Sequence, residues 1–290
     1  MSGPEATVRR GFAEVDEGQV HYREAGWTVS PARTLVMLHA SPGSAKMLEP
    51  LICRLGRRRH VVALDCLGNG DSSPPAGVEP SMAYFADAHR RALDSLGVGR
   101  FDLYGAHTGA NAAAEIAIAA PDRVRSLILD GVSHYTRAQR EEMLARYAPE
   151  VRIDSAGLHL LWVWQFVRDA YLFWPWYRRD SANRRPVGLP DADDLHDKFV
   201  EVMKSCRTYH MPYRAAIAYD KTSRLPLVSV PVLLCCSKQD MFGEYFDAIT
   251  KLLPAAEAVI TPGTSTPEAT DETVSVFEAF LDAARTDGAS

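Results

Sequence analysis

The stretch that decides the fold is FDLYGAHTGANAAAEIAIAA, residues 101–120. It begins with a short apolar run, typical of a buried strand, and ends with a run of small residues, typical of a closely packed helix. Between the two, Gly105 and Gly109 stand two residues before and two residues after His107. Because glycine permits tight turns and close backbone approach, the stretch predicts a strand that turns sharply into a helix. We expect His107 to occupy the tip of that turn.

Strands and helices alternate on both sides of this unit. Nearly continuous apolar runs, as in strands buried on both faces, occur before and after it, and helical patterns separate them. These runs lie at 34–40, 60–66, 124–132, 230–240 and 257–263. Two segments with partial alternation, 11–17 and 19–26, predict an antiparallel pair of strands. The order predicts an α/β fold with an open, mostly parallel sheet and helices on both faces.

The alternation stops between residues 136 and 224. This segment is helical in outline and carries four of the five tryptophans within LWVWQFVRDAYLFWPWYRRD, residues 161–180. We interpret it as a helical cap inserted into a core formed by 1–135 and 225–290. Large aromatic side chains usually hold a core together, and we expect that role for most of them. Trp164 and Trp174 are the two that we predict to face a ligand cavity beneath the cap.

Composition argues against several classes of partner. The formal net charge is -5, and the densest basic cluster, RLGRRRH at 54–60, is interpreted as the solvated end of a helix, so no nucleic-acid surface is expected. No apolar stretch reaches the roughly 18–20 residues of a membrane helix. The N-terminal MSGPEATVRRGF lacks the apolar core of a signal peptide. We therefore expect no membrane partner.

The cysteines and the missing cofactor motifs complete this frame. Five cysteines, an odd number, form no metal-ligand spacing, so reduced thiols in the cytoplasm are the simplest interpretation. The sequence has no dinucleotide-binding fingerprint, P-loop or metal motif, and we expect no cofactor and no metal. The predicted partners are a small-molecule substrate and, as a possibility, a second copy in a homodimer.

Four landmarks, in order, resemble the α/β-hydrolase superfamily over essentially the whole chain. LHASPGSA (38–45) looks like the HGxPG-type loop after the third strand, and ALDCLGNGDSS (63–73) is similar to the loop after the fourth. YGAHTGA (104–110) occupies the nucleophile elbow, G-x-S-x-G. CSKQD (236–240) ends at Asp240, where the acid of the triad commonly lies. The resemblance implies the α/β-hydrolase fold, with a mostly parallel eight-stranded sheet flanked by helices and an inserted cap.

Two departures from that pattern remove the standard serine triad. His107 replaces the nucleophile of the elbow. The last loop, PGTSTPEATDE (262–272), has Thr266 or its neighbour where the family places its histidine. Of the three usual roles, only the acid, Asp240, keeps its place.

A histidine at the elbow could still perform proton transfer. Histidine enters the positive-φ region several times more readily than most residues, so it suits the tight turn. The positive end of the following helix disfavours imidazolium, and we therefore predict a neutral imidazole near pH 7 that acts as a general base. Its reach allows a contact with Asp240, giving a His–Asp dyad without a covalent nucleophile. Backbone N–H groups around Thr108 and the 39–43 loop could face a developing oxyanion.

Four other residues are candidates for contact with the substrate. Ser41 could point into the site or stabilise its loop, and His39 either braces that loop or takes part in binding. Asp130 and His134 flank the end of the sixth predicted strand, close to where ligands bind in open α/β sheets. Asp130 could also serve as a second acid.

These features predict an enzyme with a His-centred general-base site and a small or medium, partly apolar substrate. Hydrolysis of an activated bond and non-hydrolytic proton transfer, as in a lyase, decarboxylase or cyclase, both fit this site. The alternative is a catalytically silent pseudo-hydrolase that binds a ligand, because two members of the triad are missing.

Overall fold

The computed structural model describes residues 6–30, 34–77 and 79–286 of the 290-residue chain. The outer limits predicted for the core, at residues 1 and 290, lie outside the described residues, as do the first five residues of the N-terminal stretch.

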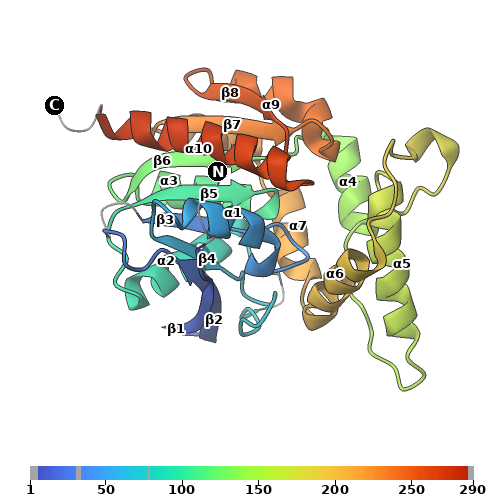
Figure 1. Ribbon diagram of the computed structural model, residues 1–290. Coiled ribbons are helices and arrows are strands. Elements are labelled where there is room, and N and C mark those ends of the chain that lie inside the picture. Colours follow the sequence, from blue (N-terminus) through green and yellow to red (C-terminus); the bar gives the residue numbers. More distant parts are fainter. Residues whose placement is uncertain (1–5, 31–33, 78, 287–290) are drawn as a thin grey trace.

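An eight-stranded sheet forms the centre of the molecule, with strand order β1-β2-β4-β3-β5-β6-β7-β8 (Figure 1). The strands are β1 (Arg9–Val15), β2 (Gly18–Ala25), β3 (Leu35–Leu38), β4 (Val61–Leu64), β5 (Phe101–Ala106), β6 (Val124–Asp130), β7 (Val232–Ser237) and β8 (Glu257–Thr261). β1 pairs with β2, and β2 with β4, in antiparallel fashion, whereas the pairs from β4 to β8 are parallel. The predicted fold class is confirmed.

Helices cover both faces of the sheet, as alternation of side chains along a strand requires. In β3, Leu35 and Met37 pack into one apolar cluster with α1 and α10, whereas Val36 and Leu38 pack into another with α2 and α3. All four side chains are buried, which explains the continuous apolar run. The helices are α1 (Glu49–Leu55), α2 (Met82–Ser95), α3 (Thr108–Ala119), α9 (Phe246–Leu252) and α10 (Pro267–Thr286).

The turn from β5 into α3 depends on its glycines. A Cβ atom on Gly105 would lie 2.4 Å from the carbonyl oxygen of Gly109, and one on Gly109 would lie 2.3 Å from that of Leu38. Such distances leave no room for a side chain, so the helix can start this close to the sheet only with glycine at both positions. His107 sits between them at φ 49°, a positive value, as predicted.

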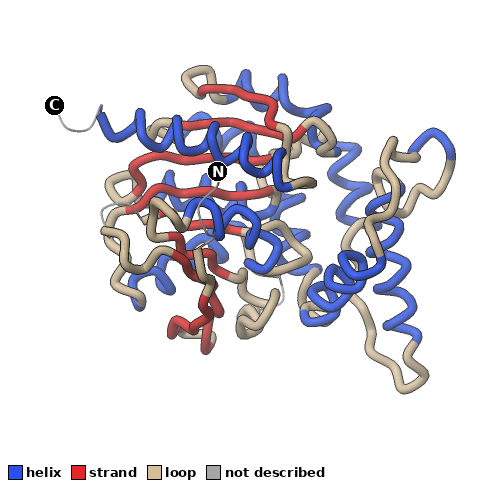
Figure 2. Tube along the Cα trace, in the orientation of Figure 1, coloured by secondary structure: helices blue, strands red, loops and turns tan. Residues whose placement is uncertain are grey.

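The segment between β6 and β7 is helical and lies at one end of the sheet (Figures 1 and 2). Its helices are α4 (Arg137–Arg146), α5 (Leu158–Leu172), α6 (Ala192–Lys204), α7 (His210–Ala218) and α8 (Lys221–Arg224). It has its own aromatic cluster, in which the rings of Trp162 and Phe166 stack at 5.5 Å and Trp176 is buried. Most of its aromatic side chains therefore pack against one another. We call residues 136–224 the inserted segment.

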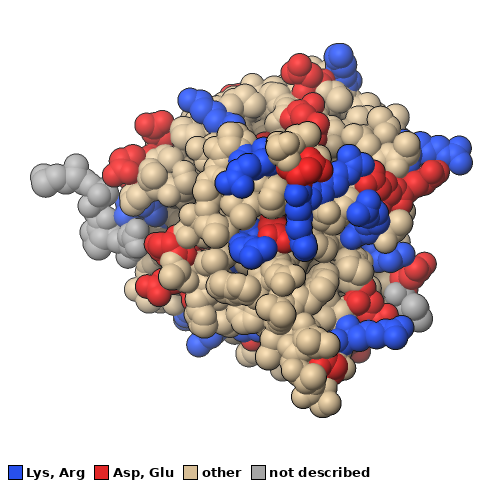
Figure 3. All heavy atoms as spheres, turned by 90° about the vertical axis from the view of Figure 1, so that its right-hand side faces the viewer, with Lys and Arg blue, Asp and Glu red and all other residues tan. Residues whose placement is uncertain are grey.

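The basic cluster at 54–60 corrects one prediction. Arg59 is fully buried rather than solvated, and it pairs with Asp282 of α10 at 2.5 Å and lies 3.9 Å from Asp102. The cluster thus links the end of α1 to α10. On the face that includes the inserted segment, basic and acidic side chains are interspersed (Figure 3).

All five cysteines are free thiols, and Cys235 and Cys236 are buried in β7, as predicted. Within the described ranges, no helix has both the length and the apolar character needed to span a membrane. A cytoplasmic location, a homodimer and the absence of a nucleic-acid partner stay predictions.

Candidate functional site

His107 and Asp240 form a hydrogen-bonded pair at the ends of two parallel strands. His107 follows β5 and precedes α3, and Asp240 lies in the turn after β7. The imidazole Nε2 atom is 2.7 Å from Oδ2 of Asp240. The histidine side chain is 27% exposed and the aspartate side chain 10% exposed, so the imidazole remains accessible. Nδ1 makes no hydrogen bond to any residue that the structure describes. The predicted contact is therefore present.

Three neighbouring groups fix this pair. Gly131 has φ +65°, and a Cβ atom there would lie 2.5 Å from Cδ2 of His107 and 2.6 Å from Oδ2 of Asp240. The second carboxylate oxygen of Asp240 accepts the backbone N–H of Phe242 at 2.8 Å and caps a short helix, η5 (Met241–Tyr245). The ring of Phe242 packs against the imidazole at 4.6 Å. Each carboxylate oxygen of Asp240 thus accepts one hydrogen bond, and the lack of a side chain at Gly131 leaves room for the pair.

The charge distribution shifts the pKa of His107 in the direction opposite to the one expected from the helix N-terminus. Burial lowers the pKa of His107, but the charge and hydrogen bond of Asp240, with the charge of Asp130, outweigh it, so this pKa lies above its ordinary value. Burial raises the pKa of Asp240, and the His107 charge and hydrogen bond bring it below its ordinary value.

Asp130 lies near the pair without bonding to it. It ends β6, and its Oδ2 accepts the hydroxyl of Tyr104 at 2.8 Å. Burial, with the charge of Asp240, raises the pKa of Asp130 to about 6, against the hydrogen bond from Tyr104. Its own charge raises the pKa of His107. The acid that holds the imidazole is therefore Asp240, and Asp130 contributes through its charge.

Thr108 and Ser41, the two residues predicted to border an oxyanion pocket, are both buried. Thr108 is the first residue of α3 and is buried, and the first N–H groups of a helix have no partner within it. Ser41 is 6% exposed, and its hydroxyl oxygen has no hydrogen-bond partner among the described residues.

His39 braces its loop, which rules out the predicted contact with a substrate. One ring nitrogen, Nδ1, lies 2.8 Å from the carbonyl oxygen of Ala40, and the other, Nε2, accepts the backbone N–H of Cys66 at 2.9 Å. The ring is 2% exposed. Both nitrogens are used, so neither is left for a ligand.

His134 makes no hydrogen bond, ion pair or ring contact with His107 or Asp240 in the described part of the chain. Burial lowers its pKa, and the charges of Lys221 and Arg140 add to this effect, against that of Asp220. These three charged residues belong to the inserted segment. A role for His134 in substrate binding stays a prediction.

The two predicted tryptophans differ in their placement. The ring of Trp174 lies 5.4 Å from that of Phe242, which packs on the imidazole, and its Nε1–H donates to Glu244. Trp164 is 37% exposed, and its ring contacts Phe199 of α6. Trp174 therefore supports the apolar wall of the site. The prediction for Trp164 is wrong, because its side of α5 faces solvent.

In the loop after β8, Thr266 stands where a histidine was expected from the resemblance, and it caps a helix. Thr266 is exposed, and its hydroxyl accepts the backbone N–H of Ala269 at 3.2 Å. It thereby satisfies an N–H group in the first turn of α10. The residue performs a structural task and offers no base.

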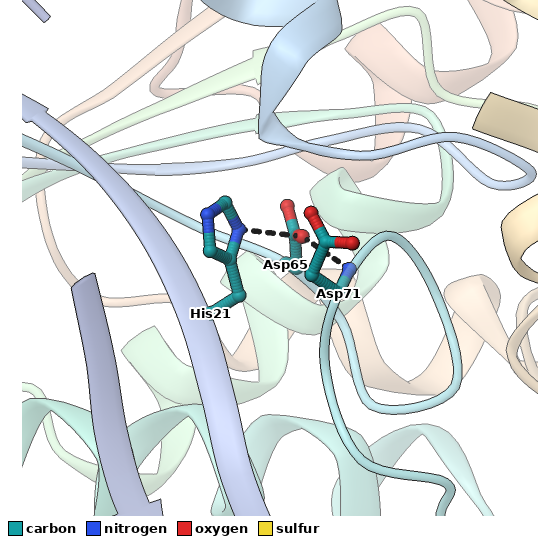
Figure 4. A group of neighbouring side chains, drawn as sticks. All are labelled: His21, Asp65 and Asp71. Atoms are coloured by element: carbon teal, nitrogen blue, oxygen red, sulfur yellow. Dashed lines mark hydrogen bonds and ion pairs between the residues drawn. The ribbon is translucent and has the colours of Figure 1, made fainter. Parts of the chain in front are cut away.

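One group of side chains has the spacing of metal ligands. His21, Asp65 and Asp71 place ligand atoms within 4.8 Å of one another (Figure 4). The fully buried Asp65 already accepts hydrogen bonds from His21 Nδ1 at 2.8 Å, from Ala45 N–H at 2.7 Å and from Asp71 N–H at 3.0 Å. A metal ion would have to replace these bonds, which tie the loops after β3 and β4 to β2. We assign the group a bracing role.

Three residues near the pair were missed from the sequence. Gly131 directly follows a strand, a position that could have indicated a special backbone conformation. Phe242 and Lys198 had no such signal. Lys198 lies on α6, and its Nζ donates to the carbonyl oxygen of Pro42, in the loop after β3, at 3.0 Å.

Comparison with known proteins supports the fold. The family described as alpha/beta hydrolase fold matches residues 33–173. An enol-lactonase from Burkholderia xenovorans LB400 superposes with a TM-score of 0.70 at 18% identity, covering 94% of this chain and 100% of that one. A hydrolase from Pseudomonas aeruginosa PA01 gives 0.70 at 19% identity, with coverage of 94% and 98%. At such identities the likeness establishes the fold alone.

Curated relatives match part of the chain. A 2-hydroxy-6-oxononadienedioate/2-hydroxy-6-oxononatrienedioate hydrolase of Pseudomonas putida is 37% identical over 131 residues, 41% of this chain and 44% of the relative. A protein of the same name in Paraburkholderia xenovorans is 35% identical over 131 residues, 43% of this chain and 42% of the relative. The chain thus spans less than half the length of these relatives.

Proposed function

Because this chain has the α/β-hydrolase fold, we propose that it is an enzyme in which His107, paired with Asp240, acts as a general base. The substrate is a small or medium, partly apolar molecule. It binds between the core and the inserted segment, which acts as a cap over the ends of the strands.

The observation that carries this proposal is the 2.7 Å bond between Nε2 of His107 and Asp240, with Nδ1 left open. In a serine triad the acid likewise holds one imidazole nitrogen and leaves the other to move protons. Here Nδ1 takes a proton from water or from the substrate, and Asp240 stabilises the imidazolium that results. The raised pKa of His107 makes it a stronger base, although a smaller fraction of it is unprotonated near neutral pH.

The remaining parts of the site suit such proton transfer. N–H groups at the start of α3, around Thr108, are the donors that we assign to a developing oxyanion. Phe242 and Trp174 supply an apolar wall beside the imidazole. An apolar wall partly excludes water and so strengthens the electrostatic interactions at the site.

Two reaction types fit this arrangement. The relatives of Pseudomonas putida and Paraburkholderia xenovorans are named hydrolases, which supports water activated by His107 as the attacking group. Proton abstraction from carbon, as in a lyase, decarboxylase or cyclase, needs the same base and no covalent nucleophile. Both begin with proton uptake at Nδ1.

A silent ligand-binding protein is the second candidate. Its supporting observation is Thr266, which caps α10 where the family has its histidine, so the loop has been turned to a structural task. The retained and well-oriented Asp240 favours the enzyme, because a protein that only binds has no need of a buried acid on an imidazole.

Turnover by His107→Ala protein tests the proposal. The assay uses 2-hydroxy-6-oxononadienedioate, named for the relatives, together with aryl esters and carbamates. His60→Ala, at the opposite ends of the parallel strands, serves as the matched control. Loss of a general base should lower turnover by roughly 10²–10⁴-fold with binding intact, whereas the control should retain its rate. Near wild-type turnover by His107→Ala contradicts the proposal. No turnover by the wild type on any of these compounds favours the silent binder.

A further inference from the structure

Lys198 is a cation without an acidic partner at the edge of the site. Its Nζ atom donates to the carbonyl oxygen of Pro42 at 3.0 Å and lies 3.2 Å from the sulfur of Met47. No carboxylate in the described part of the chain is within ion-pair distance of it. Burial lowers the pKa of Lys198 to about 8, so the amine is mostly charged at neutral pH. The negative charge of Glu201, three residues along α6, acts against this effect of burial but forms no ion pair with Lys198. An ammonium that is partly removed from water and has no ion pair among the described residues can accept a further anionic partner.

The charge of this ammonium acts on two histidine rings. It is one of the smaller effects that lower the pKa of His107 and of His39. The carbonyl group that it contacts, that of Pro42, belongs to the residue after Ser41. Lys198 therefore sits beside the loop that flanks the proposed oxyanion pocket.

A cleft gives a ligand access to this position. It has a volume of about 770 Å³ and runs between α6, α1 and the loop after β8. Lys198 lines it together with Tyr171 and residues 264–266, the loop in which the histidine of a triad would stand. His107 and Asp240 are not among the residues that line this cleft.

The other basic side chains that line the cleft are already paired. Lys46 bonds to Asp197 at 2.7 Å, and Arg54 bonds to Asp271 at 2.5 Å. Lys198 alone among the lysines and arginines that line this cleft, in the part of the chain that the structure describes, has no acidic partner.

The carboxylates near Lys198 in the cleft limit the negative charge of a ligand that could bind there. Glu201 lines the same cleft and is engaged by Lys204 at 3.1 Å and by the hydroxyl of Ser44. Asp194 also lines it. With these carboxylates nearby, a single ammonium suits a singly charged anion and disfavours a phosphate, which carries nearly two charges.

Contacts that α6, and Thr208 beyond its end, make with two loops hold the ammonium in place. Beyond the Lys198–Pro42 bond, Lys204 pairs with Asp71 at 3.2 Å, and the hydroxyl of Thr208 donates to the carbonyl oxygen of Gly68 at 2.5 Å. A cation fixed before binding loses little freedom when the anion arrives, which favours affinity.

We propose that Lys198 binds the carboxylate of a ligand that enters this cleft. This inference rests on the proposed function in taking that ligand to be the substrate on which His107 acts. Lys198 is then the residue that selects anionic substrates, and its role is separate from proton transfer.

A matched pair of probes tests this without knowledge of the substrate. Binding of 4-phenylbutanoate and of its neutral amide, 4-phenylbutanamide, is measured by calorimetry on the full chain. Hydrogen bonds to charged groups predict an affinity for the acid about 10- to 100-fold above that for the amide. Lys198→Met should abolish this ratio, and Lys198→Arg should keep much of it. Lys251→Met, at an exposed position of α9 outside the cleft, is the control and should leave the ratio unchanged.

His107→Ala separates this proposal from the proposed function. The acid-to-amide affinity ratio should be unchanged in that variant, because the carboxylate binds the ammonium of Lys198. If the ratio is lost, the imidazolium of His107 binds the anion and the proposal is overturned. Equal affinity of acid and amide for the wild type, a ratio unchanged in Lys198→Met, or no binding of the acid likewise overturns it. Failure of the general-base mechanism would leave the ratio intact and appear only as turnover by His107→Ala.

Discussion

Nε2 of His107 lies 2.7 Å from Oδ2 of Asp240, so the acid holds the ring nitrogen that is farther from the backbone. In a serine triad the acid holds Nδ1, and Nε2 exchanges protons with the nucleophile. Moving the histidine from the last loop to the elbow reverses this assignment and leaves Nδ1 as the proton acceptor. The acid still orients the base, as in a triad, but no serine hydroxyl stands between the base and the substrate.

The pH dependence of activity should reveal this pair. Nδ1 must be unprotonated to act, so kcat/KM should fall as the pH drops through the pKa of His107. Because Asp240 raises that pKa, Asp240→Asn should move the acid limb to lower pH and reduce the maximal rate by roughly 10²–10⁴-fold. Rate profiles between about pH 5 and 9 would check both effects. An acid limb at the same pH in both proteins would argue against the assignment.

Gly131 should be intolerant of any side chain. In Gly131→Ala, the new methyl group would lie 2.5 Å from Cδ2 of His107 and 2.6 Å from Asp240. We expect the pair to separate and turnover to fall by at least about 10²-fold. The φ value of +65° adds about 1–2 kcal/mol of backbone strain, measured as a loss in the free energy of unfolding.

Gly97→Ala is the matched control for that substitution. Gly97 has φ +68°, and a Cβ atom there meets nothing within 4 Å. It should show the backbone strain alone, with full turnover. If both variants lose the same stability and keep their activity, the close approach at Gly131 has no functional meaning.

Sequence patterns predicted much of this fold and one of its functional contacts. The continuous apolar runs of β3 and β4 gave the parallel centre of the sheet, because strands buried on both faces need them. The elbow glycines and the acid after β7 located His107 and Asp240. The direction of the imidazole pKa was not predictable, because it depends on the distances of Asp240 and Asp130 from the ring.

Residues in the inserted segment were the hardest to assign. Its aromatic side chains share a composition but not an environment: Trp174 packs on Phe242, whereas Trp164 faces solvent. Lys198 carries no motif, and its position depends on how α6 docks on the loops after β3 and β4. Such long-range packing leaves no local pattern in a single sequence.

Covalent chemistry at the elbow should be absent. Fluorophosphonate probes that trap serine hydrolases should not label the chain, and aryl esters should give no burst of acyl-enzyme. His107→Ser should not restore hydrolysis, since Thr266 caps a helix and cannot activate a hydroxyl. Mass spectrometry of the labelled protein is the measurement. Stoichiometric modification of Ser41 would instead identify an unrecognised nucleophile.

Of the two predicted tryptophans, we expect Trp174 alone to affect activity. Trp174→Leu should loosen Phe242 and lower kcat/KM by about 5- to 10-fold, the usual cost of truncating a well-packed aromatic side chain. Trp164→Leu should leave kcat/KM unchanged, because that ring is exposed and contacts Phe199. Circular dichroism would verify that both variants fold. Equal effects of the two substitutions would mean that the wall has no specific role.

The central claim is tested most directly by an NMR titration of the His107 imidazole nitrogens in the wild type and in Asp240→Asn, since it needs no substrate. The account predicts a pKa above the ordinary value of 6.5 in the wild type and a lower one in the variant. Above that pKa, the neutral ring should carry its proton on Nε2, bonded to Asp240, with Nδ1 bare. A wild-type pKa at or below 6.5, or a proton on Nδ1 in the neutral ring, would contradict it.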